Sequence, residues 1–199
     1  MVMGFARRIL LAGAISAATS ANAISLSPVK LDLPAGQRAV ALGVTNDSMS
    51  PRTYDVRILK WVSTSGDGTF DSTSAVITAR PVINIPPGQT ATIRVAVLQR
   101  SAAPADYYRV FVEDITPVSQ ASESVRMRYS LPMQVMNSRL AKGSLQRVDG
   151  ALINSGTAAV FVAGVKKDGT SDVFRYLLPG ERWETKFLPE DLDWTSGIQ

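Results

Sequence analysis

The sequence predicts an all-β protein with two immunoglobulin-like β-sandwich domains, of which the second is small or truncated. Three observations lead to this fold class. Hydrophobic and polar residues alternate along most of the chain, which predicts half-buried strands. Clusters of Gly, Pro, Asn and Asp separate the alternating segments, as tight turns require. No segment shows clear helical periodicity, and about seven short strands in roughly 110 residues are typical of an immunoglobulin-like sandwich.

The first 23 residues predict a secretory signal peptide. Arg7 and Arg8 form a positively charged start, residues 9–18 form a short apolar run, and residues 21–23 (Ala-Asn-Ala) supply the small side chains that signal peptidase accepts. We therefore expect cleavage after Ala23. The alternatives are a buried N-terminal helix or an uncleaved anchor, but the run is shorter than the about 20 residues that span a bilayer. No other stretch approaches that length, so we expect no stable membrane insertion.

Composition excludes several classes of site. The chain has no Cys and no His, which removes disulfides, Ser-His-Asp triads, Cys nucleophiles and His- or Cys-based metal sites. The net charge of +4 falls to +2 without Arg7 and Arg8, because 19 basic residues then face 17 acidic ones. No cluster of Lys and Arg resembles a nucleic-acid patch. We therefore expect no nucleic-acid partner and no cofactor.

The first domain, residues 24–136, is predicted from segments that place apolar side chains at every second position. The first segment covers residues 25–33 and contains Lys30. The others cover residues 40–45, 54–61, 91–97, 108–113 and 125–131. Turn clusters follow at 34–36, 46–48, 65–68, 86–88 and 102–104. This order predicts consecutive strands joined by short turns.

The second domain, residues 137–199, is predicted from four further segments after a boundary near 135–141. These segments cover residues 145–153, 159–165, 173–178 and 181–188. Glu190, Asp191 and Asp193 indicate a solvated acidic stretch near the C-terminus. A domain of about 60 residues is marginally stable alone. We therefore expect it to lean on the first domain.

The remaining candidate constellations favour structural roles. Residues 66–68 (Gly-Asp-Gly) and 167–169 (Lys-Asp-Gly) lack the further oxygen ligands of a calcium loop, and indicate tight turns. Glu113 and Asp114 are neighbours in a strand and point to opposite faces, so they cannot form a catalytic pair. No activated nucleophile can be named, and we expect no enzyme and no metal site.

Two basic features are candidates for function. Residues 124–132 place Arg126 and Arg128 on one face of a strand and apolar side chains on the other. This could equally be an ordinary core strand with a solvated outer face. Lys30 lies inside a predicted strand, where a plain surface lysine is the alternative.

The order of motifs along the chain resembles the periplasmic chaperones of the chaperone–usher pilus pathway, in the archaic, or spore-coat-like, branch. The matching segments are residues 25–31, 34–37, 44–47, 54–61, 85–88, 93–95, 108–112, 128–132 and 177–180. The most specific match is Pro87-Gly88 followed by Arg94. The resemblance covers nearly the whole chain after Ala23.

This resemblance implies a periplasmic chaperone for pilin or fimbrial subunits, which it would deliver to an outer-membrane usher. Such chaperones lend their seventh strand to an incomplete subunit, an instance of strand addition. The donor-strand residues would be Val125, Met127 and Tyr129. The subunit's C-terminal carboxylate would be held by Lys30 and Arg128, with Arg126 as the runner-up for the second position.

The chain departs from the family at its C-terminal end. It finishes at residues 194–199 without the closing strands that the family leads us to expect. The alternative function is an exported structural or adhesive immunoglobulin-like surface protein without chaperone activity. A subunit of that kind should carry a donor extension, whereas the residues after Ala23 enter the first predicted strand at once.

Overall fold

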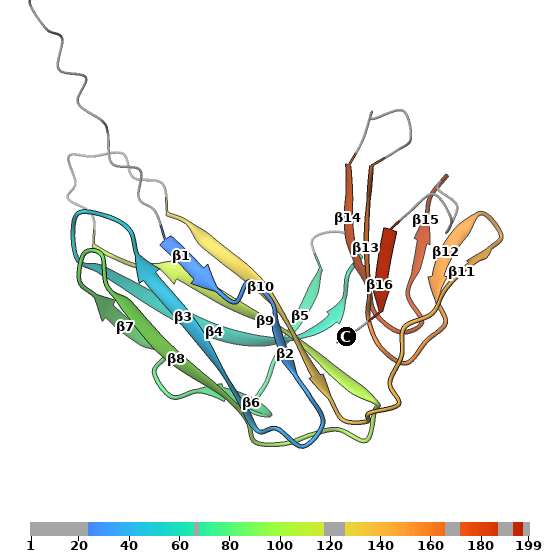
Figure 1. Ribbon diagram of the computed structural model, residues 1–199, viewed down its shortest axis with the longest axis horizontal. Coiled ribbons are helices and arrows are strands. Elements are labelled where there is room, and N and C mark those ends of the chain that lie inside the picture. Colours follow the sequence, from blue (N-terminus) through green and yellow to red (C-terminus); the bar gives the residue numbers. More distant parts are fainter. Residues whose placement is uncertain (1–23, 66–67, 118–125, 166–171, 187–192, 197–199) are drawn as a thin grey trace, which may run out of the picture.

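The computed structural model describes residues 24–65, 68–117, 126–165, 172–186 and 193–196. Its regular elements in these ranges are strands, in two lobes that meet at an angle (Figure 1). The first lobe contains β1 to β10, and the second contains β11 to β16. The predicted all-β class with a larger first and a smaller second lobe is confirmed.

The first lobe is a sandwich of two sheets. The four-stranded sheet has the order β1 (Ile24–Ser27), β3 (Ala39–Asn46), β8 (Thr90–Val97), β6 (Val76–Thr78). The six-stranded sheet has the order β2 (Leu31–Leu33), β10 (Arg128–Met136), β9 (Ala105–Asp114), β4 (Arg52–Ser63), β5 (Thr69–Ser72), and β7 (Val82–Ile85) also pairs with β4.

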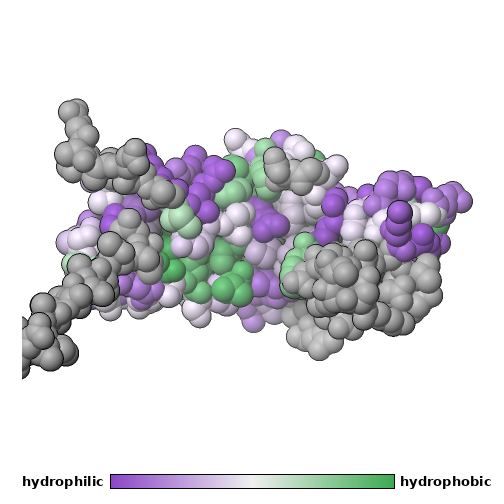
Figure 2. All heavy atoms as spheres, turned by 90° about the horizontal axis from the view of Figure 1, so that it is seen from above, coloured by the Kyte–Doolittle hydropathy of each residue, from purple (hydrophilic) through white to green (hydrophobic). Residues whose placement is uncertain are grey.

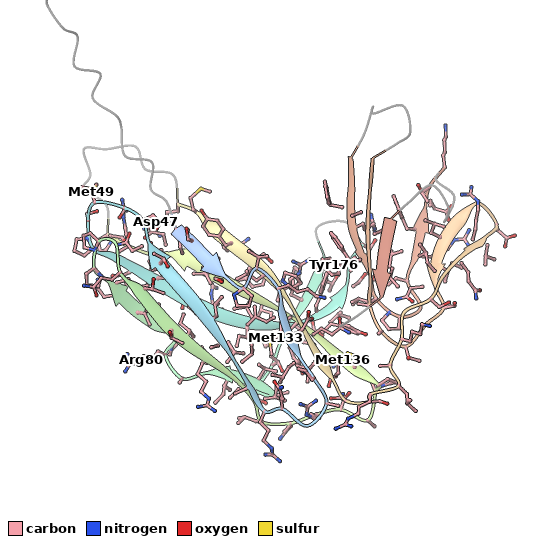
Figure 3. All side chains as sticks on the ribbon, viewed as in Figure 1. Asp47, Met49, Arg80, Met133, Met136 and Tyr176 are labelled. Carbon is pink, nitrogen blue, oxygen red and sulfur yellow. The ribbon has the colours of Figure 1, made fainter. Side chains whose placement is uncertain are left out.

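Apolar side chains from the inner faces of both sheets fill the first core. Leu42, Ile93, Val110 and Met133 are each at most 2% exposed, and Met133 points into this lobe (Figure 3). Burying such side chains stabilises a fold by about 1.5–3 kcal/mol each. The period-two alternation therefore predicted the core faces of β3, β8, β9 and β10 correctly.

The predicted first strand, residues 25–33, is wrong as a single element. It is two strands in different sheets: β1 pairs antiparallel with β3, and β2 pairs parallel with β10. The break covers residues 28–30, where Pro28 has no N–H to donate to a ladder. Lys30 consequently lies in the bend just before β2 rather than within a strand.

Several other strand boundaries differ from the prediction. The segment between β4 and β8 contains β5, β6 and β7, which are short and were not predicted. β10 begins at Arg128 and continues past Pro132 to Met136, because it pairs with β9 along its whole length. Val125 lies outside the described residues.

The second lobe has two three-stranded sheets around a small core. One sheet has the order β11 (Leu145–Val148), β12 (Ala151–Asn154), β15 (Arg182–Glu184), and the other β14 (Asp172–Leu177), β13 (Val160–Val165), β16 (Asp193–Ser196). The core cluster is formed by Leu145, Leu152, Val160, Val162 and Leu177. Among the described residues of this lobe the core cluster is small, as expected for a lobe of this size.

Two predictions for the second lobe need correction. Residues 145–153 are not one strand but the hairpin β11–β12, whose turn is Asp149-Gly150 with φ values of 47° and 80°. A two-residue turn with both φ positive favours Asp-Gly, so the signal was present in the sequence. Asp193, predicted to lie in a solvated acidic stretch, begins β16, which pairs with β13, so the chain does have a strand at the end predicted to lack closing strands; Glu190 and Asp191 lie outside the described residues.

Both lobes contain the same structural corner, in which a buried asparagine lies next to a Pro-Gly turn from a later part of the chain. The side-chain amide of Asn46 donates to the carbonyls of Ser50 (2.8 Å) and Ile85 (2.9 Å). The amide of Asn154 donates to the carbonyls of Ala158 (2.8 Å) and Leu177 (2.9 Å) in the same way.

The Pro-Gly turns complete the two corners. The N–H of Gly88 donates to the Asn46 carbonyl at 2.7 Å, and the N–H of Gly180 to the Asn154 carbonyl at 2.8 Å. Both glycines have positive φ, which favours residues without a Cβ. The lobes therefore repeat one structural device, although the sequences show no obvious repeat.

A third apolar cluster joins the lobes. It combines Trp61, Ala105, Tyr107 and Met136 of the first lobe with Ala158, Ala159 and Leu178 of the second. Met136 lies where the two lobes meet (Figure 3). Glu181 adds polar contacts, because its carboxylate accepts from the N–H of Thr64 at 2.6 Å and from the Thr64 hydroxyl. These contacts agree with the expectation that the second lobe packs against the first.

Candidate functional site in the cleft between the lobes

A cavity of about 390 Å³ lies between the lobes. Strands β4, β5, β9 and β10 contribute to it from the first lobe, and β14 from the second. Its lining includes Trp61, Thr64, Phe70, Arg109, Ser130, Phe174, Arg175 and Tyr176. The two arginines give the cleft a cationic character, in contrast to the apolar junction cluster beside it.

Arg109 is the central basic residue of the cleft. It lies on β9 on the face opposite to Tyr108 and Val110, which belong to the first core. Its Cζ atom lies 3.8 Å from the ring centroid of Trp61 and 5.7 Å from that of Tyr176. Tyr176 projects between the lobes (Figure 3). The guanidinium is thus held by an aromatic ring from each lobe, a geometry of cation–π contacts.

The electrostatics of the cleft favour an incoming anion. Burial lowers the pKa of Arg109, because the charged guanidinium loses hydration, and the neighbouring Tyr176 partly opposes this. Burial likewise raises the pKa of Tyr176. Among the described residues, the buried Nε atoms of Arg109 and Arg175 have no hydrogen-bond partner. The Nη groups of the two guanidiniums make only long contacts, so they can form charge-assisted hydrogen bonds to a carboxylate.

Other contacts of the two guanidiniums are long. Nη1 of Arg109 donates to the Ser130 carbonyl at 3.4 Å, and Nη2 of Arg175 donates to the Thr64 carbonyl at 3.5 Å. Such distances are at or beyond the range of strong N–H···O bonds. The guanidinium of Arg109 is therefore oriented mainly by Trp61 and Tyr176, and the Cζ atom of Arg175 lies 5.6 Å from the ring centroid of Trp183, so the Nη groups of both keep donor capacity.

Lys30 lies at about the same position along the strand direction as Arg109, two strands away in the six-stranded sheet. Leu31 on β2 pairs with Met133 on β10, and the adjacent Pro132 pairs with Arg109 on β9. Because neighbouring strands are about 4.8 Å apart, the backbone just before Leu31 lies about 10 Å from Arg109. Lys30 forms an ion pair with Asp32 at 2.9 Å.

Asp32 brings a negative charge to the same face. It pairs with Gln134 on β10, two residues along from Pro132, the partner of Arg109, and its charge adds to the effect of burial in raising the pKa of Tyr176. Its Oδ1 atom is buried without a hydrogen-bond partner among the described residues, while Oδ2 binds Lys30. Asp32 thus neutralises part of the positive charge that Lys30 brings to the cleft.

Arg128, predicted as the second anchor, lies elsewhere. It begins β10, five residues before Met133, which corresponds to about 16 Å along the strand. Its Cζ atom is 5.4 Å from the ring centroid of Phe111, at a separate cavity of about 360 Å³ that also includes Arg57. The structure does not bring Lys30 and Arg128 together, and their shared clasp stays a prediction. Arg126, the runner-up, is exposed and precedes β10.

The predicted donor strand has one open edge in the described structure. β9 pairs with all of β10, but β2 pairs only with Met133 to Val135. Residues 128–132 therefore have no strand on their other side within the described part of the chain. Tyr129 is half-buried and Met127 is 41% exposed, in the same alternating row as the buried Leu131.

Hydrophobic side chains are also gathered on the upper face of the first lobe, as Figure 2 shows. An unpaired strand edge with a row of apolar side chains is the kind of surface to which another chain can add a strand.

Sequence reasoning missed Arg109 and Arg175 as site residues. A signal for Arg109 was available, since it is the one charged residue amid the apolar residues 107–112 and alternation places it away from the core. No comparable signal identified Arg175, because only the packing of β14 against the first lobe brings it to the cleft. In the described ranges no group of three or more acidic residues gathers to hold a metal ion. The same ranges contain no helix long and apolar enough to cross a membrane.

Comparison with known families identifies the fold. The family model of pili and flagellar-assembly chaperones, PapD N-terminal domain, matches residues 23–137. The chain belongs to this family. Its members are non-enzymatic chaperones, and those of the chaperone–usher pathway are periplasmic. The resemblance inferred from the motif order is thereby confirmed, and this protein is a pilus-assembly chaperone. A search of curated protein sequences gives no match.

Solved structures extend the similarity to both lobes. A chain of the CsuC–CsuE chaperone–tip subunit pre-assembly complex from the archaic Csu pili of Acinetobacter baumannii is 16% identical, with a TM-score of 0.65 over 87% of this chain and 97% of that one. The periplasmic chaperone SfaE is also 16% identical, with a TM-score of 0.66 over 89% of this chain and 100% of its own.

A third similar structure is a complex of the SafA pilin with the SafB chaperone from Salmonella enterica. Its matching chain is 13% identical, with a TM-score of 0.64 over 84% of this chain and 86% of that one. At these identities the matches establish the fold of both lobes of the chaperone, and they confirm the predicted pair of immunoglobulin-like domains.

Proposed function

We propose that this chaperone binds pilin or fimbrial subunits in the periplasm by lending them β10, and delivers them to an outer-membrane usher. The observation that supports the first step is the open edge of β10 at residues 128–132. The related CsuC–CsuE and SafB–SafA structures are complexes of a chaperone with a subunit. No catalytic step is needed for this function, because strand addition is a binding event.

The apolar row on β10 supplies specificity in this proposal. Main-chain hydrogen bonds along the open edge bind any extended strand, while side chains on alternate positions fill pockets in the client. Tyr129 and Met127 are incompletely buried in the free chaperone, so a client can cover them. Val125, two residues before Met127 in the sequence and outside the described residues, is proposed as the third donor residue.

The cleft supplies the anchor. We propose that the C-terminal carboxylate of the client binds Arg109, with Lys30 on the same face and Arg175 opposite. The guanidinium of Arg109 is preorganised by Trp61 and Tyr176, so little side-chain entropy is lost when the carboxylate binds. Arg109 thus takes the role that the sequence had given to Arg128.

Capture of a pilin in the periplasm tests the donor strand. The chaperone is co-expressed with a candidate pilin from a neighbouring gene, and the complex is co-purified. We expect Met127→Asp and Tyr129→Asp to abolish the complex, because a charge in an apolar client pocket is costly unless it is paired. Met49→Asp is the matched control, since Met49 is 82% exposed and lies outside β10. Equal capture by all three variants would show that β10 is not the donor.

A further inference from the structure

A second cavity at the junction of the lobes is distinct from the cavity of the proposed client site and shares only Trp61 with it among the described lining residues. It has a volume of about 460 Å³ and receives side chains from both lobes. We call it the hinge pocket; the residues that matter for its chemistry are Lys60, Trp61, Asp71, Tyr107, Leu178 and Pro179. Its size lies within the range of about 300–1,000 Å³ that is usual for small-molecule sites.

The walls of the hinge pocket are apolar and aromatic. Trp61, Tyr107 and Leu178 are each less than 10% exposed and belong to the apolar cluster that joins the lobes. A planar hydrophobic molecule in the pocket would extend this cluster and contact the first lobe and the second together. Aromatic rings that pack against Trp and Tyr are stabilised beyond the burial of their surface.

The charged residues of the hinge pocket balance each other. Lys60 and Asp71 are cross-strand partners between β4 and β5, and both are exposed. Opposite charges in that position attract each other. The pocket therefore offers no net charge to a ligand and favours an uncharged aromatic molecule with a polar group at its exposed end.

Trp61 connects the hinge pocket to the cleft. Its side chain lines both cavities, and its ring lies 3.8 Å from the guanidinium carbon of Arg109 and 5.5 Å from the ring of Tyr176. A ligand that packs against Trp61 restricts the ring that positions Arg109. Such a ligand contacts both lobes, so it also stabilises the angle between the lobes at which both contacts are made. This follows because a ligand shifts an equilibrium toward the state that it binds more tightly.

We propose that the hinge pocket binds a small uncharged aromatic molecule, and that this binding is coupled through Trp61 to the Arg109 site. The coupling rests on the proposed carboxylate anchor, whereas the pocket itself does not. Because coupling is reciprocal, client and aromatic ligand change each other's affinity by the same factor.

The pocket is tested with the fluorescent neutral amine N-phenyl-naphthylamine as the probe and the mature chaperone without client. We expect one saturable site whose affinity falls by at least about tenfold in Ala103→Trp, since Ala103 is an exposed lining residue and the new ring fills the space. Ala102→Trp is the matched control, because Ala102 is a neighbour that is also exposed and does not line the pocket. Equal probe affinity in the two variants, or no saturable binding, would overturn the proposal.

A second variant that fills the pocket keeps the test valid if Ala103→Trp fails to fold. Val62 lines the pocket and is 47% exposed, so Val62→Trp should also lose the probe while keeping a cooperative urea transition. If a well-folded Val62→Trp retained the wild-type probe affinity, the hinge pocket would not be the site.

The coupling is tested with a client peptide that ends in a free carboxylate. Saturating probe should change the dissociation constant of this peptide by about fivefold or more, and should have no effect in Ala103→Trp. An unchanged constant in the wild type would refute the coupling and leave the pocket result standing. If the peptide failed to bind even without probe, the carboxylate anchor would be wrong and the pocket would remain.

Discussion

Replacing Arg109 by Met separates a binding role from a structural role. The variant removes the charge and keeps an unbranched apolar chain over Trp61. Truncating one partner of a desolvated charge pair costs about 2–5 kcal/mol, so we expect a client peptide with a free C-terminal carboxylate to bind about 30-fold or more weakly. The same peptide with an amidated C-terminus should bind wild type and variant alike.

The stability of the free chaperone should change little. Arg109→Met loses a cation–π contact with Trp61, worth about 0.5–2 kcal/mol. It also removes a buried Nε–H that has no partner among the described residues, which relieves a penalty of about 1–3 kcal/mol. The two effects oppose each other, so the free energy of unfolding should stay within about 1 kcal/mol of wild type or rise.

Two measurements check this reasoning. Isothermal titration compares the free-acid and amidated peptides, and urea denaturation gives the free energy of unfolding. Arg94→Met is the matched control, since Arg94 is exposed on β8 in the opposite sheet and should leave both quantities unchanged. A variant that binds the free acid as tightly as wild type but unfolds more easily would show that Arg109 is structural.

Three further predictions concern the second anchor, the repeated corner and the buried tyrosines. Lys30→Ala should reduce the ratio between the affinities for the free-acid and the amidated peptide, whereas Arg128→Ala should leave this ratio unchanged. The opposite result in titrations would support Arg128 as the second anchor, as predicted from the sequence. Asn154→Ala removes a fully buried amide that donates to two carbonyls, and should lower the free energy of unfolding by about 2–4 kcal/mol in urea melts, while the exposed Asn84→Ala should not. Burial raises the pKa of Tyr107 to about 12 from an ordinary value of 10. Its folded-state pKa is above the unfolded one, so its contribution is complete below pH 10 and is lost as the pH rises toward 12. In urea melts at alkaline pH, Tyr107→Phe should make the free energy of unfolding fall less steeply with pH. An unchanged dependence on pH would contradict a raised pKa of Tyr107.

The sequence by itself determined the all-β class and the inward faces of the long strands. Alternation in β3, β8 and β9 is enough for this, because side chains in a strand point to opposite faces in turn. The order of turn motifs, with Pro87-Gly88 as the most specific, was also enough to find the chaperone family.

Only the tertiary structure decided which strands meet and which residues share a site. A period of two fixes the face of a residue but not its neighbours across the sheet, so residues 25–33 looked like one strand although they divide between two sheets. The register of β9 against β10 places Arg109, rather than Arg128, at the level of Lys30. The packing of β14 brings Tyr176 and Arg175 to the same cavity from the second lobe. Contacts between residues far apart in the chain depend on strand pairing and lobe packing, which local residue patterns do not encode.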